Sequence, residues 1–379
     1  MNTRSGHYVQ QSGAYRTFIP KKLPPKPPVQ IDDEMLALLS QADHALGKLD
    51  GSTDNLPNPD LFVFMYVRKE AVLSSQIEGT QASLMDILEF EAKALEHGAP
   101  PDVAEVSRYV NAMNYGLDRL KKLPLCLRVI REIHQILLTD VRGSQRNPGE
   151  FRKVQNWVGP KGAPMKEATY IPPPVPDMLK ALQDLEKFLH DTRPMPTLLH
   201  VGLVHAQFET IHPFLDGNAR VGRLLSTFML CEREILKRPL LYLSYYFKEN
   251  RSEYYQRLQS VRDEGDWEGW LKFFLRGVRQ VAQECASTAR GILDLREHDR
   301  QLIAKEIGRS AGKALAILES LFLRPIVSVD SVTDIAQCSF ANANNLVSRL
   351  CHLGILSEMT GRRRYRRFSY SPYLALFTE

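Results

Sequence analysis

The stretch that decides the fold of this chain reads Ile211-His212-Pro213-Phe214-Leu215-Asp216-Gly217-Asn218-Ala219-Arg220-Val221-Gly222-Arg223. The apolar pattern before it predicts a helix over 197–210, and the Asp-Gly-Asn turn leads directly into a second helical segment. The backbone N–H groups at 217–220 would be the unpaired donors of that second helix, which is a favourable place for an anion. Arg220 and Arg223 lie three residues apart, so both guanidinium groups project from one face of the first turn.

The side chains of this loop suit a polyphosphate and a reaction at a hydroxyl group. Two guanidinium groups beside a helix N-terminus match a polyphosphate, and Asp216 offers a hard oxygen ligand for Mg²⁺. His212 can accept a hydroxyl proton near neutral pH. Each of these features is common by itself, but their order and spacing together indicate a functional site.

The stretch resembles the signature of the Fic family, H-x-F-x-D/E-G-N-G-R-x-x-R, whose members transfer AMP from ATP to protein hydroxyl groups. One specified position differs, because Ala219 stands where the family usually has glycine; a methyl group there fits a helical backbone but not a positive φ. The resemblance implies that His212 is the general base, Asp216 the Mg²⁺ ligand and Arg223 the partner of the γ-phosphate. The residues that the resemblance assigns to ATP are Glu78, Gly217, Asn218, Ala219, Arg220, Val221, Gly222, Arg223, Tyr254 and Tyr255.

A second motif, Ser74-Ser75-Gln76-Ile77-Glu78-Gly79, ends an apolar stretch, Leu61–Ile77, that predicts a buried helix. By pattern alone it is a helix C-terminus with Gly79 as the terminating glycine. It also resembles the family's inhibitory motif, [S/T]-x-x-x-E-[G/N], with Ser74, Glu78 and Gly79 at the specified positions. The resemblance implies that Glu78 pairs with Arg223 and withholds it from the γ-phosphate. Some family members use this glutamate to activate water and remove AMP, so deAMPylation is an alternative.

The segment 139–176 is rich in glycine and proline and predicts a hairpin-type flap with strand-like pieces at 152–158 and 168–171. By resemblance, a target protein docks along its edge by adding a strand. The docking residues would be Gln155, Asn156, Trp157, Val158 and Gly159. The stretch around Tyr254 and Tyr255 is mostly core by periodicity, whereas the resemblance implies that both tyrosines border the adenine or ribose.

From about residue 310, the order helix, short helix, helix and hairpin predicts a winged helix-turn-helix module. Its predicted wing carries Arg362, Arg363, Arg364, Arg366 and Arg367, and the formal net charge of the whole chain, +5, equals these five arginines. A solvated edge strand that avoids aggregation and a phosphate contact with DNA both explain this charge. In the DNA interpretation, Phe340–Leu353 is the recognition helix.

The composition of the 379 residues, 44% hydrophobic and 25% charged, is that of a folded chain and excludes a fibrous or disordered one. No apolar run approaches the ~20 residues of a membrane helix. The N-terminus lacks the apolar segment of a secretory signal, and the five cysteines are scattered, so we expect reduced thiols, no membrane contact and a cytoplasmic location.

The predicted fold class is mainly α: a Fic-type helical core with a β-hairpin flap, plus a C-terminal winged helix-turn-helix domain. The predicted domains are an extended Pro-rich arm (1–30), an N-terminal helical region with the inhibitory helix (31–110), the Fic catalytic core (111–295) and the winged helix-turn-helix domain (310–379).

The hypothesis is a self-inhibited, Mg²⁺-dependent protein adenylyltransferase that uses ATP, modifies Ser, Thr or Tyr of a target protein docked along the flap, and, by resemblance, forms a homodimer. Besides deAMPylation, a second alternative is a DNA-binding regulator whose Fic core senses nucleotide without transferring it; Ala219 and the basic wing motivate it.

Overall fold

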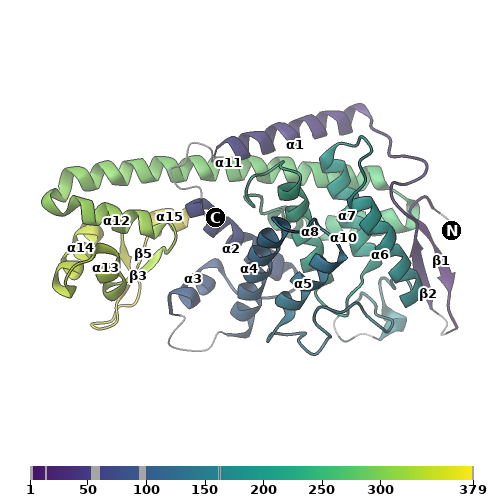
Figure 1. Ribbon diagram of the computed structural model, residues 1–379, viewed down its shortest axis with the longest axis horizontal. Helices are drawn as coiled ribbons and strands as arrows, with labels where there is room; N and C mark the ends of the chain where they lie inside the picture. Colours follow the sequence, from purple (N-terminus) through teal and green to yellow (C-terminus); the bar gives the residue numbers. More distant parts are fainter. Residues whose placement is uncertain are drawn as a thin grey trace.

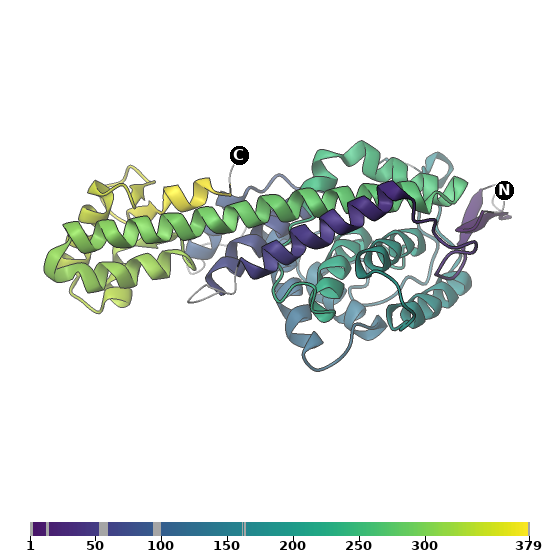
Figure 2. The ribbon, with the colours of Figure 1, turned by 90° about the horizontal axis from the view of Figure 1, so that it is seen from above.

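The computed structural model describes residues 3–12, 15–52, 60–93, 100–160, 162 and 164–377, without the side chains of residues 60–62 and 93. The molecule is elongated and mainly helical (Figure 1). Helix α11 (Trp267–Glu306) has 40 residues and runs along most of its length. Helix α1 (Asp33–Gly51) lies beside α11 in both views (Figures 1 and 2). Lys272 of α11 joins the two helices through ion pairs of 2.6 Å to both Asp32 and Glu34.

In the described residues, four helices follow α1 and precede the flap. They are α2 (Asp60–Ile77), α3 (Leu84–Lys93), α4 (Pro101–Leu120) and α5 (Leu127–Leu138). Helix α5 buries the apolar positions Val129, Ile133 and Leu137, which recur at helical spacing. Helix α2 is buried on most of its surface and packs against α4 and α9, as its apolar sequence predicts. Burial of α2 fixes the position of the Ser74–Gly79 motif at its C-terminal end.

The central part of the molecule is built around α7 (Thr197–Ile211), in which every residue from Leu198 to Ile211 is buried. Helix α7 packs against α6 (Val175–Leu189), α8 (Asn218–Glu232), α10 (Arg251–Glu264) and α11. A short helix, α9 (Ser244–Glu249), precedes α10 and was not predicted. Because these helices enclose α7, its C-terminal end, where the loop begins, has a fixed position in the core.

The prediction of an extended arm over residues 1–30 is wrong for its first part. Strands β1 (Gly6–Gln10) and β2 (Arg16–Pro20) form an antiparallel hairpin in which Tyr8 pairs with Phe18; residues 1–2 and 13–14 lie outside the described part of the chain. The side chain of Phe18 is fully buried, and β2 contacts α6 and α7. The extended arm was inferred from the prolines that follow β2. The residues before them form a two-stranded ribbon because it buries the aromatic side chain of Phe18.

The flap also differs from its prediction. Within the described residues of 150–175, strand-type pairing is limited to one bridge between Val158 and Tyr170, and a 3₁₀ turn (Met165–Glu167) stands nearby. The predicted strand over 152–158 does not form because this segment bonds to the loop after α7 instead: the Arg152 N–H donates to the Pro213 carbonyl at 2.9 Å, and the side chains of Arg152 and Asn156 donate to the carbonyls of His212 and Phe214. The backbone of 152–157 therefore follows the core and not a partner strand.

The C-terminal part begins after α11 and a 3₁₀ turn (Gly308–Ser310). Its elements are α12 (Ala311–Leu321), β3 (Ile326–Ser328), α13 (Val329–Ala336), α14 (Phe340–His352), β4 (Ser357–Glu358), β5 (Arg367–Ser369) and α15 (Ser371–Ala375). The sheet order is β3-β5-β4, with antiparallel pairs. The helices and the hairpin follow the predicted order, and their assignment as a winged helix-turn-helix domain stays a prediction. The predicted strand over 362–370 is shorter than expected, because residues 362–366 lie in the loop between β4 and β5.

All five cysteines are free thiols. Among the helices in the described ranges, none is long and apolar enough to cross a membrane.

Candidate active site

The loop between α7 and α8 is a tight reversal with two left-handed residues. His212 ends α7 at φ 49° and ψ 61°, and its N–H donates to the Phe208 carbonyl at 3.0 Å. Gly217 takes φ 75° directly before α8, where a glycine avoids the steric cost of that conformation. The left-handed conformation of His212 is uncommon for a residue with a side chain, and it ends the helix at this position. The predicted helix–loop–helix unit is thus confirmed.

The loop is fixed from both ends by side chains. The amide of Asn218 accepts from the N–H of Phe214 and donates to its carbonyl, both at 2.8 Å. His134 of α5 stacks on the Phe214 ring with centroids 3.7 Å apart and lies 3.1 Å from the Asp216 carbonyl. His134 was not predicted, because in the sequence it is one more buried position on the apolar face of α5. Asn218 therefore shapes the loop with its side chain, and only its backbone N–H is left to face an anion.

The imidazole of His212 is held in its neutral form. Burial and the nearby Arg152 guanidinium lower the pKa of His212 to about 3, and the backbone carbonyl of Glu209 acts in the opposite direction. The carbonyl of His212 accepts from Arg152 Nε at 3.1 Å and from Asn156 Nδ2 at 3.2 Å. Near pH 7 the imidazole is therefore neutral, which is the form that can accept a proton, and its low pKa makes it a weaker base than a free histidine.

Asp216 and Arg220 form the next part of the site. The Asp216 carboxylate accepts from the Gly217 N–H at 2.6 Å and lies 3.9 Å from Arg220, and 41% of its side chain is exposed. Arg220 is almost fully buried, lies 3.7 Å from Glu105, and its Nε and Nη1 have no hydrogen-bond partner in the part of the chain that the structure describes. Buried donors without partners are costly, so this arrangement favours an anionic ligand.

A single half-exposed carboxylate with one engaged oxygen fits Mg²⁺, which proteins bind through one or two carboxylates, with waters and substrate phosphates completing the shell. Within the described ranges, no group of three or more His, Cys, Asp or Glu residues stands close enough together to form an all-protein metal site. Asp216 is therefore suited to a shared ion and not to a dedicated metal cage.

Arg223 is bound to the end of α2. Its Nε donates to Ser74 Oγ at 2.7 Å, and its Nη2 donates to the Ser74 carbonyl at 2.9 Å and to Glu78 Oε1 at 3.0 Å. The Arg223 side chain is 1% exposed and that of Glu78 is 31% exposed. Burial acts to lower the pKa of Arg223, but Glu78 and Tyr254 outweigh it and the net direction is upward. Gly79 has φ 94° and ends the segment, as a terminating glycine does.

Two buried carboxyl groups near Arg223 were not found from the sequence. Burial raises the pKa of Glu209, on α7, to about 7, and its Oε1 has no partner among the described residues. Gly222 allows this approach, because a Cβ there would lie 2.5 Å from that oxygen. Burial also raises the pKa of Glu70 to about 7; its oxygens accept from the Ser244 hydroxyl at 2.5 Å and from the Tyr109 hydroxyl at 3.1 Å. Neither glutamate belongs to a recognisable motif.

The predicted nucleotide-binding residues differ in whether their side chains are exposed or buried. Ala219 lies in the first turn of α8 without a positive φ, so its methyl group fits the backbone. Val221 is fully buried in the core, whereas Tyr255 is 38% exposed, with Glu78 and Arg223 both affecting its pKa. The prediction that Tyr254 borders the adenine or ribose is wrong. Its side chain is fully buried and its hydroxyl lies 2.9 Å from His205 Nε2, so it presents no surface to a nucleotide.

Among the predicted docking residues, some bond to the protein itself and others are exposed. Asn156 is 8% exposed and its Nδ2 donates to the Phe214 carbonyl at 2.8 Å, so its side chain supports the loop and is not accessible to a target. Gln155 Nε2 donates to the Pro172 carbonyl at 2.9 Å. Trp157 is 40% exposed, Gly159 is exposed, and Val158 makes the single bridge to Tyr170.

The five arginines of the basic wing do not act as one patch. Arg362, Arg363 and Arg364 are exposed. Arg366 donates to Asn344 of α14 at 2.6 Å, and Arg367 donates to the Ala92 carbonyl of α3 at 2.8 Å. Three arginines are thus turned to solvent, and the other two hold the loop to α14 and to the N-terminal helical region.

Comparison with known proteins identifies the family. The "Fic/DOC family N-terminal" model matches residues 36–118, and the "Fic/DOC family" model matches residues 124–230. The chain belongs to the Fic/DOC family. A crystal structure of a Fic family protein from Desulfovibrio desulfuricans G20 superimposes with a TM-score of 0.59 at 20% identity, covering 90% of this chain and 97% of that one. A Fic-domain signaling protein from Bacteroides thetaiotaomicron covers 67% of this chain and 97% of its own, with a TM-score of 0.51 at 16% identity. Both show the Fic fold.

Curated relatives carry the name protein adenylyltransferase Fic. The Drosophila grimshawi protein is 29% identical over 168 residues, and the Drosophila mojavensis protein is 30% identical over 168 residues. These matches cover 44% of this chain but only 30% and 29% of the relatives.

Proposed function

We propose that this Fic protein is a self-inhibited protein adenylyltransferase, which transfers AMP from ATP to a Ser, Thr or Tyr hydroxyl of a target protein. The single observation that carries the proposal is the ion pair of 3.0 Å between Glu78 and the buried Arg223. It joins two motifs that are 145 residues apart in the sequence and engages the guanidinium that the γ-phosphate would need. The name shared by the curated relatives supports the reaction.

The reaction uses residues of the α7–α8 loop. The target hydroxyl loses its proton to the neutral His212 imidazole as its oxygen attacks the α-phosphorus. The new O–P bond forms while the bond from the α-phosphorus to the bridging oxygen breaks, and pyrophosphate leaves. The first N–H groups of α8 and the Arg220 guanidinium stabilise the negative charge on the phosphates. Mg²⁺, held by Asp216 and the phosphates, would neutralise further charge.

The resting state blocks one part of this assembly. Arg223 is bound to Ser74 and Glu78, so a γ-phosphate can reach it only after the Glu78 contact breaks. ATP would otherwise bind with its phosphates misplaced, and phosphoryl-type transfer depends on positioning. Release of the Ser74–Gly79 segment would therefore switch the enzyme on.

Incubation of the Glu78→Gly variant with α-labelled ATP and Mg²⁺, alone and with a cell lysate, tests the proposal. We expect label on protein that disappears in the Glu78→Gly/His212→Ala double variant, and weaker label with the conservative Glu78→Gln. A folded Glu78→Gly protein that labels neither itself nor the lysate would overturn the proposal.

The partial exposure of Glu78 favours one alternative, in which its carboxylate activates water and removes AMP from a modified target. Wild type would then release AMP from a pre-modified protein, and Glu78→Gly would not. The exposed Arg362–Arg364 loop favours a second role, contact with DNA phosphates.

A further inference from the structure

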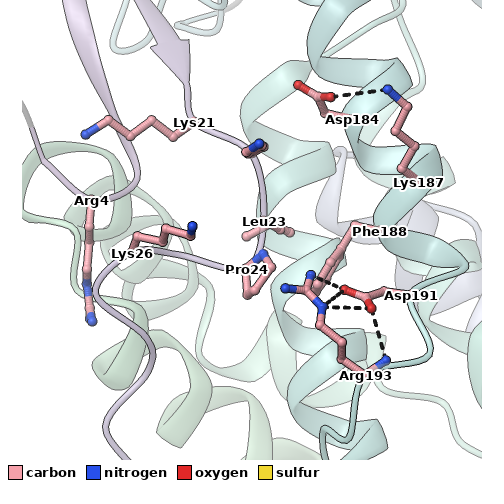
Figure 3. A pocket seen from close by; sticks show the side chains of 11 residues that line it. Arg4, Lys21, Leu23, Pro24, Lys26, Asp184, Lys187, Phe188, Asp191 and Arg193 are labelled. Atoms are coloured by element: carbon pink, nitrogen blue, oxygen red, sulfur yellow. Dashed lines mark hydrogen bonds and ion pairs between the residues drawn. The ribbon is translucent and has the colours of Figure 1, made fainter.

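A pocket of about 480 Å³ lies between the N-terminal segment and α6, and the mechanism above makes no use of it (Figure 3). One wall is formed by Arg4 and the chain after β2, and the other by the C-terminal end of α6 and the loop that follows. The lining residues are Arg4, Lys21, Lys22, Leu23, Pro24, Lys26, Asp184, Lys187, Phe188, Asp191 and Arg193.

The pocket is strongly basic. Six of its side chains are cationic and two are carboxylates, and Arg4 also pairs with Glu268 beside the pocket, so the formal excess is three positive charges. Both carboxylates are already engaged: Asp191 accepts from Arg193 Nε at 2.9 and 2.8 Å, and Asp184 lies 3.9 Å from Lys187 (Figure 3). Cationic groups that share one cavity raise the local concentration of anions.

Two lysines on the rim remain available. Lys22 and Lys26 are exposed, and neither forms an ion pair or hydrogen bond with any described residue. The floor is apolar, since Leu23 is 8% exposed and Phe188 is 3% exposed. An apolar floor with a cationic rim suits a ligand with a hydrocarbon stem and an anionic end, such as the side chain of glutamate.

The wall that carries these lysines is fixed to the core. The Lys21 N–H donates to the Ser5 carbonyl at 2.8 Å, and Gln207 Nε2 of α7 donates to the Lys21 carbonyl at 2.8 Å. The backbone at Lys21, directly before Lys22, is therefore fixed before any ligand binds, which lowers the entropic cost of binding.

The pocket adjoins the flap through β2. The N–H of Phe18 donates to the Ile171 carbonyl at 3.1 Å, so β2 lies beside the end of the flap. Lys21 follows Phe18 by three residues, which at a rise of about 3.3 Å per residue places it about 10 Å farther along. A polypeptide that docks along the flap would reach the pocket within a few residues.

We propose that this pocket binds an acidic segment of the protein substrate and thereby selects the target. The proposal rests on the proposed function, because it takes the substrate to be a protein. An acidic peptide is favoured over nucleic acid because the two lysines without partners among the described residues, Lys22 and Lys26, border one cavity with an apolar floor next to the flap, whereas nucleic acid is bound along an extended basic track.

Fluorescence anisotropy with a labelled octaglutamate peptide tests the binding. Wild type is expected to bind with an affinity that falls with salt, and Lys22→Glu/Lys26→Glu to bind at least tenfold more weakly. The matched control, Lys305→Glu/Arg309→Glu, makes the same charge change at the C-terminal end of α11 and in the 3₁₀ turn after it, on exposed residues far from the pocket, and should bind as wild type does. Equal weakening by both pairs, or no weakening by the first, would overturn the proposal. So would stronger competition by a single-stranded oligonucleotide than by unlabelled octaglutamate.

A transfer assay separates this proposal from the proposed function. In the Glu78→Gly background, a serine peptide with a glutamate cluster should have a lower KM than one with a lysine cluster. Lys22→Glu/Lys26→Glu should raise that KM and leave kcat unchanged. If the enzyme labels both peptides with equal KM, the pocket does not select the target, and the proposed function is unaffected. A failure to label either peptide, with octaglutamate still bound, contradicts the proposed function and with it the role in selection.

Discussion

Replacing Glu78 by glycine is expected to raise the affinity for ATP by about ten- to a hundredfold while leaving the affinity for ADP almost unchanged. The substitution removes one hydrogen bond of 3.0 Å between a carboxylate and a guanidinium. Hydrogen bonds to charged groups are worth about 1.5–3 kcal/mol. In the variant, this bond no longer competes with the binding of a γ-phosphate to Arg223. At about 1.4 kcal/mol per factor of ten, its loss corresponds to a gain in ATP affinity of about one to two factors of ten. ADP has no γ-phosphate and serves as the control ligand.

The same substitution should reduce stability. Arg223 is 1% exposed and keeps its bonds to Ser74, but it loses its counter-charge. Removing one partner of a fully buried pair costs about 3–5 kcal/mol, and because Glu78 is 31% exposed we expect a smaller cost, about 1–3 kcal/mol. Titration calorimetry with both nucleotides and urea unfolding measure the two effects.

A double-mutant cycle decides whether the gain in ATP affinity depends on Arg223. In an Arg223→Ala background, Glu78→Gly should no longer change the affinity for ATP, because the guanidinium that the glutamate restrains is absent. An equal gain for ATP and ADP, or a gain that persists without Arg223, would refute the reasoning. An unchanged ATP affinity in the folded single variant would refute it as well.

Three further predictions concern pH, stability and the basic loop. Because burial lowers the pKa of His212 to about 3, its imidazole resonances should not titrate by NMR between about pH 5 and 8; a midpoint near its ordinary value of about 6.5 would contradict this. Burial raises the pKa of Glu209 from 4.5 to about 7, so its contribution to stability is full below its unfolded value and is lost as pH rises through 7; Glu209→Gln should gain on the order of 3 kcal/mol relative to wild type between about pH 4.5 and 8, measured by urea unfolding. Replacing Arg362–Arg364 by alanine should reduce the slope of log affinity for DNA against log salt by up to about 3, whereas Arg367→Ala should lower the Tm and leave the slope unchanged, because it removes the bond to Ala92.

Local features of the site could be predicted because they depend on neighbours in the sequence. The helix before His212, the turn at Gly217 and the start of α8 follow from apolar spacing and from the turn residues. Gly79 likewise ends its segment with a positive φ. These features depend on only a few adjacent residues.

Features that join distant segments could not be predicted in the same way. Periodicity marks His134 and Glu209 as ordinary positions on buried helix faces. Only packing shows that His134 supports the Phe214 ring and that Glu209 lies against Gly222 with an unpaired oxygen. The predicted flap strands failed for the same reason, since Arg152 and Asn156 bond to carbonyl groups of a loop about sixty residues away.

The sequence by itself determined the order of chemical groups from His212 to Arg223, because that order is carried by one continuous loop and the first turns of α8. Only the tertiary structure decided which other groups meet: Glu209 with Gly222, the N-terminal hairpin with the flap, and Arg367 with α3. The pairing of Glu78 with Arg223 was expected from the family resemblance, not from the residues beside either group. The physical reason is burial. A charged or polar group removed from water must find a partner wherever the packing of helices provides one, and that partner is not encoded in the residues beside it.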